Sequence, residues 1–216
     1  MEIMEIIEQR HSVRKYNTKP IEDKKRHVID RMVEEINADA DLNIQVFYDE
    51  PKCFKSFLAK YGHFKNANNY ISIVGKKSDT LDERAGYFGE KLVLSLKEME
   101  IDSCWVALTH GKSKAVIGKG EKEVIIISFG YADNHGVPHK SKSMADCCNY
   151  STNLPSWFIE GMKAVMLAPT ALNQQKFFFR CDEEYVTATT KPGSYTQVDL
   201  GIAKFHFEVV SLHKVE

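Results

Sequence analysis

The sequence predicts an α+β fold, because segments with a helical period alternate with short β-branched or apolar segments. Thr18 and Pro20 open a stretch in which apolar residues up to Ile36 recur on one face every 3.6 residues, which predicts an amphipathic helix. A second helix is predicted over 81–99, and apolar residues surround so much of it that we expect it to be central to the fold. At 216 residues and 43% hydrophobic, the chain is long enough for one core or two small fused lobes.

Short strands are predicted where β-branched and aromatic residues lie between polar or Pro-containing turns. The apolar run 103–108 and the strand 123–129 are expected at the core of the sheet. A basic, Pro-containing connector over 136–143 precedes a helix expected over 155–167. Further strands are expected at residues 43–48, 70–74, 177–179 and 185–190, with a turn at 191–194.

The segment 199–212 satisfies the spacing of both a strand and a helix. A comparison inside the chain favours the helix, because the order helix, strand, turn and Gly-containing apolar segment occurs over 25–99 and again, shortened, over 157–213. This alignment places Gly86 opposite Asp199, although short α/β units can also look alike by chance. It predicts two related halves, residues 1–135 and 136–216.

The composition excludes several classes of protein. A net charge of -1 gives no global attraction to nucleic acid or to anionic lipid, and the apolar runs are far shorter than a membrane span. Acidic residues interrupt the N-terminus before any apolar signal segment forms, so we expect no export. Five cysteines without a CxxC spacing argue against a disulfide framework or a zinc site and favour the reducing cytoplasm.

Two short segments carry the strongest functional signals. Residues 10–16, Arg-His-Ser-Val-Arg-Lys-Tyr, place two guanidinium groups and a hydroxyl within five positions, a donor set that suits a phosphate. A solvated basic edge before a helix is the alternative reading of the same residues. Residues 168–175, Ala-Pro-Thr-Ala-Leu-Asn-Gln-Gln, join a helix-ending proline to amides that can meet the hydrogen-bonding edge of a planar ring.

Both segments resemble signatures of the nitroreductase family of FMN-dependent oxidoreductases. The resemblance implies a mixed, mainly antiparallel sheet flanked by helices. In the first segment it implies that Arg10, Ser12 and Arg14, with His11 between them, hold the phosphate and ribityl chain of FMN. The family often closes a basic pair over the same phosphate, which here corresponds to Lys140 and Lys142, with a charged surface loop as the alternative.

The resemblance also assigns residues to the flavin ring. The run Ser-Cys-Trp-Val-Ala-Leu at 103–108 is similar to a family segment whose backbone N–H groups face the flavin N5 and O4, here those of Ala107 and Leu108. Taken alone, that run contains core residues. The later segment resembles the family's Pro-Ser-Ser-x-Asn-x-Gln run, although Lys-Phe rather than Pro-Trp follows it. The corresponding ring-binding residues are Pro169, Thr170, Ala171, Asn173 and Gln175.

The activity implied by the resemblance is electron transfer from NAD(P)H through FMN to a nitroaromatic, a quinone or a similar small acceptor. The flavin supplies the redox chemistry, so we name no catalytic side chain. The alternative is a flavin-binding sensor or carrier without efficient turnover. Family members usually have both segments in the first half of the chain and build each site from two subunits. Because the second segment is late here, we expect an intrachain pseudo-dimer, as a monomer or a further homo-oligomer.

Other chemical motifs fail on spacing. His135 and His139 lie four residues apart in a loop that contains Gly and Pro, and no nearby carboxylate completes a metal site. Gly111-Lys112-Ser113 lacks the upstream glycine of a phosphate-binding loop. No local signature supports Cys104 as a nucleophile. We therefore expect no metal.

Overall fold

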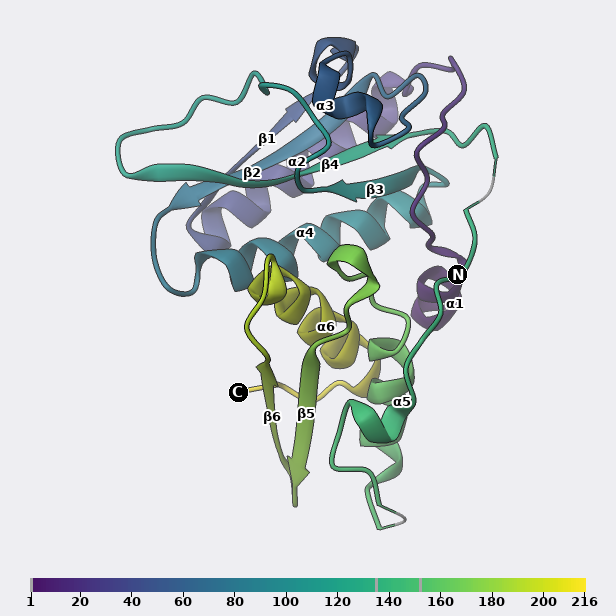
Figure 1. Cartoon of the computed structure of the whole chain (residues 1–216), viewed down its shortest axis with the longest axis vertical. Helices are drawn as coiled ribbons and strands as arrows, with labels where there is room; N and C mark the ends of the chain where they lie inside the picture. Colours follow the sequence, from purple (N-terminus) through teal and green to yellow (C-terminus); the bar gives the residue numbers. More distant parts are fainter. Residues whose placement is uncertain (1, 135, 152) are drawn as a thin grey trace. The chain divides into compact units, whose positions relative to one another are not determined.

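The computed structural model describes residues 2–134, 136–151 and 153–216 and divides into two compact units (Figure 1). The sheet unit comprises residues 10–81 and 91–137. The hairpin unit comprises residues 1–9, 82–90 and 138–216. His135, one of the two histidines considered for a metal, lies outside the described residues.

The sheet unit contains a four-stranded antiparallel sheet with the strand order β1-β2-β4-β3. Strand β2 lies inside the sheet and is buried along nearly its whole length, with Ile71 and Ile73 on one face and Tyr70, Ser72 and Val74 on the other. The strands expected from the sequence in this unit are confirmed. They are β1 (Leu42–Phe47), β2 (Asn69–Lys76), β3 (Asp102–Val106) and β4 (Glu121–Gly130).

Helix α2 (Asp23–Ala40) confirms the first predicted helix, but it begins at Asp23 rather than at Pro20. It buries Ile29, Val33 and Ile36 at helical spacing. Two short elements, the 3₁₀ turn η1 (Pro51–Phe54) and helix α3 (Phe57–Lys60), have no periodic signal in the sequence. The Ser56 hydroxyl caps α3 by accepting a hydrogen bond from Ala59 N at 3.2 Å.

The segment 10–16 runs beside β3 and adds a parallel bridge to a sheet whose strands are otherwise antiparallel. Ser12 forms a parallel bridge with Ser103, and Val13 N donates to Ser103 O at 2.9 Å. The Tyr16 side chain is almost fully buried, and its hydroxyl donates to Val13 O at 2.6 Å. The backbone that carries the arginines is therefore fixed to the sheet by hydrogen bonds and by a buried aromatic ring.

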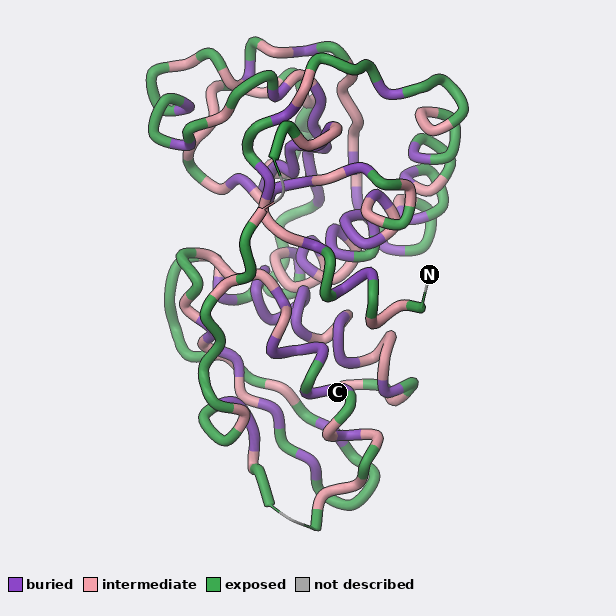
Figure 2. Tube along the Cα trace, turned by 90° about the vertical axis from the view of Figure 1, so that its right-hand side faces the viewer, coloured by how far each residue is buried: buried purple, intermediate pink, exposed green. Residues whose placement is uncertain are grey.

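The hairpin unit combines helices with a two-stranded antiparallel sheet, and buried stretches recur along the chain trace (Figure 2). The ambiguous segment 199–212 is helical, as the internal comparison predicted. Rings from different elements form the core, with Phe207 5.4 Å from both Phe158 and Phe179 between ring centroids. The elements of this unit are α1 (Ile3–Gln9), η2 (Met144–Asp146), α5 (Ser156–Val165), η3 (Ala171–Asn173), β5 (Phe177–Asp182), β6 (Tyr185–Thr190) and α6 (Thr196–Ser211).

Helix α4 (Leu81–Glu98) confirms the central helix, and its residues 82–90 belong to the hairpin unit, where they cross α6. A Cβ at Gly86 would lie 2.0 Å from Val198 O, and a Cβ at Gly201 would lie 1.9 Å from Glu83 O. Only glycine permits this approach of two backbones. The contact is reciprocal: Gly86 meets Val198, three residues before Gly201, and Gly201 meets Glu83, three residues before Gly86. This contact therefore pairs Gly86 with Gly201, whereas the alignment of the two halves by sequence places Gly86 opposite Asp199.

A buried polar pair lies beside this crossing. His206 Nε2 is 2.9 Å from Glu90 Oε1, and both side chains are fully buried. His206 Nδ1 faces Ala164 O at 2.9 Å, so the ring also links α6 to α5. A buried carboxyl group is tolerated when its partner supplies a hydrogen bond of good geometry. None of the helices among the described residues is long and apolar enough to cross a membrane.

We predict that His206→Ala lowers the free energy of unfolding by about 3–5 kcal/mol, because it leaves a buried carboxyl group without its imidazole partner. Glu90→Gln should cost less, since an amide can still hydrogen-bond to His206 Nε2. Urea denaturation followed by circular dichroism measures both. His27→Ala on the exposed face of α2 is the control and should change stability by about 0.5 kcal/mol at most. Equal losses for His27→Ala and His206→Ala would contradict the role of the pair.

Candidate functional site

The predicted phosphate donors lie together beside β3. The Arg10 side chain is buried, Ser12 is half-buried and Arg14 is exposed. Burial raises the pKa of the Cys104 thiol. The positive charges of Arg14 and Arg10 and a hydrogen bond from the Ser12 side chain act to lower it. The backbone of Ser12 bridges Ser103, the residue before Cys104, so the segment that carries the three donors runs along β3.

The backbone around Arg14 is held while its side chain stays available. Lys65 N donates to Arg14 O at 3.0 Å, and Tyr16 N donates to Lys65 O at 3.0 Å. Within the described residues, the Arg14 guanidinium has no ion-pair partner. An exposed guanidinium on a fixed backbone is suited to an anionic ligand, because little backbone entropy is lost when the ligand binds.

The loop after β3 is held in a tight conformation by His110. Its Nε2 is 3.1 Å from Ala107 O and its Nδ1 is 2.7 Å from Gly111 O. Leu108 is 71% exposed, and its backbone N–H has no hydrogen-bond partner among the described residues. A backbone N–H without a partner on an exposed residue is available to a ligand, as the resemblance implies for Leu108.

In the hairpin unit the other predicted residues form one hydrogen-bonded network. Asn173 Nδ2 and Gln175 Nε2 both donate to Lys140 O at 2.9 Å. Lys142 N donates to Gln175 Oε1 at 2.9 Å, and Lys142 Nζ donates to the carbonyl oxygens of Gln174 and Gln175 at 3.0 and 2.8 Å. The ammonium of Lys142 therefore stabilises the loop, whereas the Lys140 side chain is exposed.

The same loop adopts backbone conformations that side chains rarely take. Leu172 and Asn173 both have φ of 53° and Gln175 has φ of 43°. Asparagine tolerates this region, but leucine does not favour it, and the Leu172 side chain is fully exposed. Pro169, Thr170 and Ala171 precede these residues and are half-buried, with Thr170 Oγ1 accepting from Gln175 N at 3.1 Å.

Asp199 is a functional candidate that sequence reasoning missed. Its carboxylate accepts from Ala171 N at 2.8 Å and from Gln174 Nε2 at 2.7 Å, so α6 holds the loop 170–175 in place. Burial raises the Asp199 pKa from its ordinary value to about 6, although these hydrogen bonds oppose the shift. An acidic residue in the first turn of a helix is usually a dipole partner, so nothing in the sequence set this one apart.

The Asp199 shift predicts a pH dependence. Because the folded-state pKa of Asp199 lies above that of the unfolded chain, the folded state binds more protons between about pH 4 and pH 6, and stability decreases as pH rises through this range. From about pH 4 to pH 7 the unfolding free energy of the wild type should fall by about 3 kcal/mol relative to Asp199→Asn, which does not titrate. Denaturant titrations at several pH values measure this difference. A constant difference would contradict the prediction.

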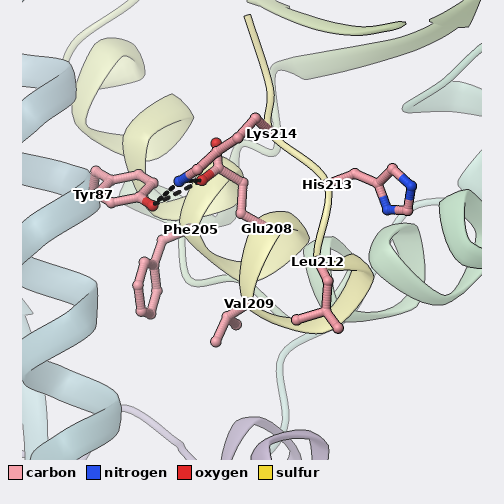
Figure 3. Close-up of a pocket in the computed structure, with 7 residues that line it drawn as sticks. All are labelled: Tyr87, Phe205, Glu208, Val209, Leu212, His213 and Lys214. Atoms are coloured by element: carbon pink, nitrogen blue, oxygen red, sulfur yellow. Dashed lines mark hydrogen bonds and ion pairs between the residues drawn. The ribbon is translucent and has the colours of Figure 1, made fainter. Parts of the chain in front are cut away.

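A separate pocket of about 300 Å³ lies beside the end of α6 (Figure 3). Its polar groups bond to one another, since Glu208 Oε2 accepts from Tyr87 Oη at 2.8 Å and from Lys214 Nζ at 2.6 Å. None of the predicted site residues lines it. The lining residues are Tyr87, Phe205, Glu208, Val209, Leu212, His213 and Lys214.

The cysteines have the character of core residues. All five are buried free thiols, and burial raises the pKa of Cys53 to about 12 and that of Cys148 to about 11. Such thiols are protonated at neutral pH and react poorly as nucleophiles. No group of three or more metal-ligating side chains occurs among the described residues.

The antiparallel sheet, the flanking helices and the donor-bearing segment beside β3 define a protein of the nitroreductase fold. The model of the family described as "Putative TM nitroreductase" matches residues 2–211. The chain belongs to this family. A comparison with curated proteins finds no match.

Solved structures agree on the fold. The chain aligns with a "putative nitroreductase" from Thermotoga maritima at a TM-score of 0.72 and 24% identity, over 97% of this chain and 83% of that one. A "putative nitroreductase" from Desulfovibrio desulfuricans, solved in complex with FMN, aligns at a TM-score of 0.53 and 18% identity, over 68% of this chain and 94% of that one. A "Putative NADH Oxidase" from Clostridium acetobutylicum aligns at a TM-score of 0.53 and 17% identity, over 69% of this chain and 99% of that one.

Proposed function

We propose that the protein is an FMN-dependent oxidoreductase that transfers electrons from NAD(P)H to a small acceptor such as a nitroaromatic or a quinone. The observation that carries this proposal is that Arg10, Ser12 and Arg14 lie on one segment bridged to β3 through Ser12 and Ser103, in a chain of the nitroreductase family. A relative of the same fold has been solved in complex with FMN, which supports the choice of cofactor.

The residues present fit the phosphate of FMN. The donor set combines a buried guanidinium, a hydroxyl and an exposed guanidinium that has no ion-pair partner among the described residues. A dianionic phosphate accepts charge-assisted hydrogen bonds from such donors. In this proposal Arg10, Ser12 and Arg14 bind the phosphate, with His11 beside them.

The isoalloxazine ring would be bound by backbone and amide groups. The N–H groups of Ala107 and Leu108 are proposed to face the electron-accepting edge of the ring, where donors stabilise the charge that develops on reduction. When bound, FMN would supply the redox chemistry, so the chain's own residues would bind and orient the cofactor and the substrates and exclude water, rather than supply an acid or a base. The proposed ring and phosphate contacts of the hairpin unit are Lys140, Lys142, Pro169, Thr170, Ala171, Asn173 and Gln175.

The network of the hairpin unit changes how these contacts are tested. The Asn173 amide already bonds to Lys140 O, and its φ of 53° would strain a leucine. A loss of flavin in Asn173→Leu would therefore not separate a flavin contact from a distorted loop. Asn173→Gly preserves the backbone conformation and removes only the side chain. Loop distortion in this variant is monitored independently by the pH dependence of stability that Asp199 confers.

We predict that FMN binds much more tightly than riboflavin, because riboflavin lacks the phosphate. Arg14→Ala should weaken FMN binding roughly ten- to a hundredfold, which corresponds to the loss of one charge-assisted contact of about 1.5–3 kcal/mol, and should leave riboflavin binding nearly unchanged. Fluorescence titration of the flavin measures both. Lys15→Ala removes the same charge from the next exposed residue and is the matched control. Riboflavin binding as tight as FMN binding would refute the phosphate assignment.

We further predict that one chain supplies all the flavin contacts, so that a monomer retains about one FMN at high dilution. The prediction follows from the late position of the segment 168–175, and the reciprocal contact of Gly86 and Gly201 within the hairpin unit resembles the two-fold contact expected if the second half stands in for a partner subunit. Sedimentation at low concentration, with flavin and protein absorbance recorded together, measures the stoichiometry. Flavin that is released as dimers dissociate would show that two chains are needed.

Turnover decides between an enzyme and a flavin-binding sensor or carrier. The FMN-loaded protein is mixed with NADH or NADPH, and the reoxidation of the flavin by a nitroaromatic or a quinone is followed in the steady state. Rapid, repeated oxidation of the nicotinamide supports the oxidoreductase. Tight FMN binding without acceptor-dependent turnover would assign the protein to the second class.

A further inference from the structure

A group of large apolar side chains is exposed on the sheet unit. Phe57, Leu58 and Tyr61 are 68%, 56% and 65% exposed, and Leu108 is 71% exposed. Phe57 and Leu58 lie in the single turn of α3, and Tyr61 is the residue that caps its C-terminal end. The rings of Phe57 and Tyr61 meet edge to face, with centroids 5.6 Å apart and an interplanar angle of 82°. This arrangement leaves aromatic surface open to a further ring.

Helix α3 is held against the loop after β3 at both of its ends. A Cβ at Gly111 would lie 2.9 Å from Ser56 Cβ, directly before the helix. A Cβ at Gly62 would lie 2.8 Å from Thr109 Oγ1, directly after it. Gly111 N also donates to Cys53 O at 2.7 Å. The exposed side chains of α3 are therefore fixed beside the loop that carries Leu108.

The two segments that meet here are both positively charged. Residues 51–64 contain three lysines and no acidic residue, and so do residues 107–120, although the whole chain has a net charge of -1. Lys114 pairs with Glu50. Lys55, Lys60 and Lys112 are exposed and form no ion pair with any of the described residues. The apolar surface thus has a cationic rim that is not neutralised by its own segments.

We propose that this aromatic–lysine patch, formed by Phe57, Leu58, Tyr61, Leu108, Lys55, Lys60 and Lys112, binds the electron acceptor and selects planar aromatic molecules that carry an anionic group. The inference rests on the proposed function, since the loop of Leu108 is the one assigned there to the flavin edge. The aromatic side chains bind the ring of the acceptor, and a lysine binds its anionic group.

Charge complementarity favours this occupant over a second copy of the chain. A second copy would place the same lysines against each other across a two-fold axis, and like charges brought together in an interface disfavour association. An anionic aromatic molecule can place its ring against the apolar side chains and its negative charge near the exposed lysines. For a nitroaromatic the reaction balances as two electrons and two protons taken up by the nitro group, from NAD(P)H and solvent, which yields the nitroso compound and water.

The first test measures binding without turnover. Equilibrium dialysis compares 4-nitrobenzoate with 4-nitrobenzamide, which has nearly the same shape and no charge. We expect the anion to bind roughly three- to tenfold more tightly at low salt and to lose that advantage at about 0.5 M salt, where exposed charges are screened. Equal binding of the two compounds at low salt would overturn the proposal.

Variants then locate the site. Tyr61→Ala should weaken binding of both compounds by roughly three- to tenfold, and Lys60→Gln should weaken only that of 4-nitrobenzoate. Tyr185→Ala is a matched control, because Tyr185 is also 65% exposed but lies in the hairpin unit. Lys24→Gln on α2 is the control for charge. Tyr61→Ala binding equal to wild type would also overturn the proposal.

Kinetics separate the acceptor step from the proposed function itself. In the FMN-loaded enzyme, Phe57→Ala should raise KM for 4-nitrobenzoate and leave the anaerobic reduction of the flavin by NAD(P)H unchanged. If the wild type neither binds FMN nor oxidises NAD(P)H, the proposed function fails, and dialysis still reports on the patch. If Phe57→Ala instead changes the sedimentation coefficient and leaves 4-nitrobenzoate binding intact, the patch is an interface between copies and the proposal is wrong.

Discussion

The close crossing of α4 and α6 is the constraint on which the hairpin unit depends. Two glycines let the helix backbones touch, and that contact fixes both the position and the rotation of α6. His206 then reaches Glu90, and Asp199 reaches the backbone of the loop 170–175. The conformation of the loop 170–175 therefore depends on α6, because Asp199 of this helix accepts a hydrogen bond from the loop backbone, and not on local turn residues alone.

The sheet unit positions its polar groups in a different way. A short parallel segment pairs with Ser103 at the edge of the antiparallel sheet, and the buried ring of Tyr16 anchors its far end. Side chains on such a segment alternate in direction, which separates the core residue Val13 from the donors Ser12 and Arg14 on either side of it. The backbone of this segment is therefore held by its bonds to Ser103 and Lys65 and by the buried side chains of Val13 and Tyr16, while the side chains of Ser12 and Arg14 are not needed for packing.

Much of the fold was predictable from sequence because long helices and β-branched strands leave a periodic signal. Helix α6 shows the limit of that signal: its apolar residues fit two periods, and only a comparison with the earlier part of the chain favoured the helix. Helix α1 and helix α3 carried no signal, since seven and four residues are too few to define a period. The arginines and amides of the candidate site were found from local motifs, whereas Asp199 acts through tertiary contacts that no local pattern encodes.

The reciprocal contact between α4 and α6 has an evolutionary consequence. In a symmetric dimer every substitution occurs twice, so both sides of an isologous interface change together. Within one chain the two sides are encoded separately and diverge independently. Lys204 pairs with Glu83, but the positions that correspond to them in the reciprocal pairing hold Gly89 and Val198, which have no charge. Each side of this crossing is therefore free to acquire its own chemistry while the other maintains the packing.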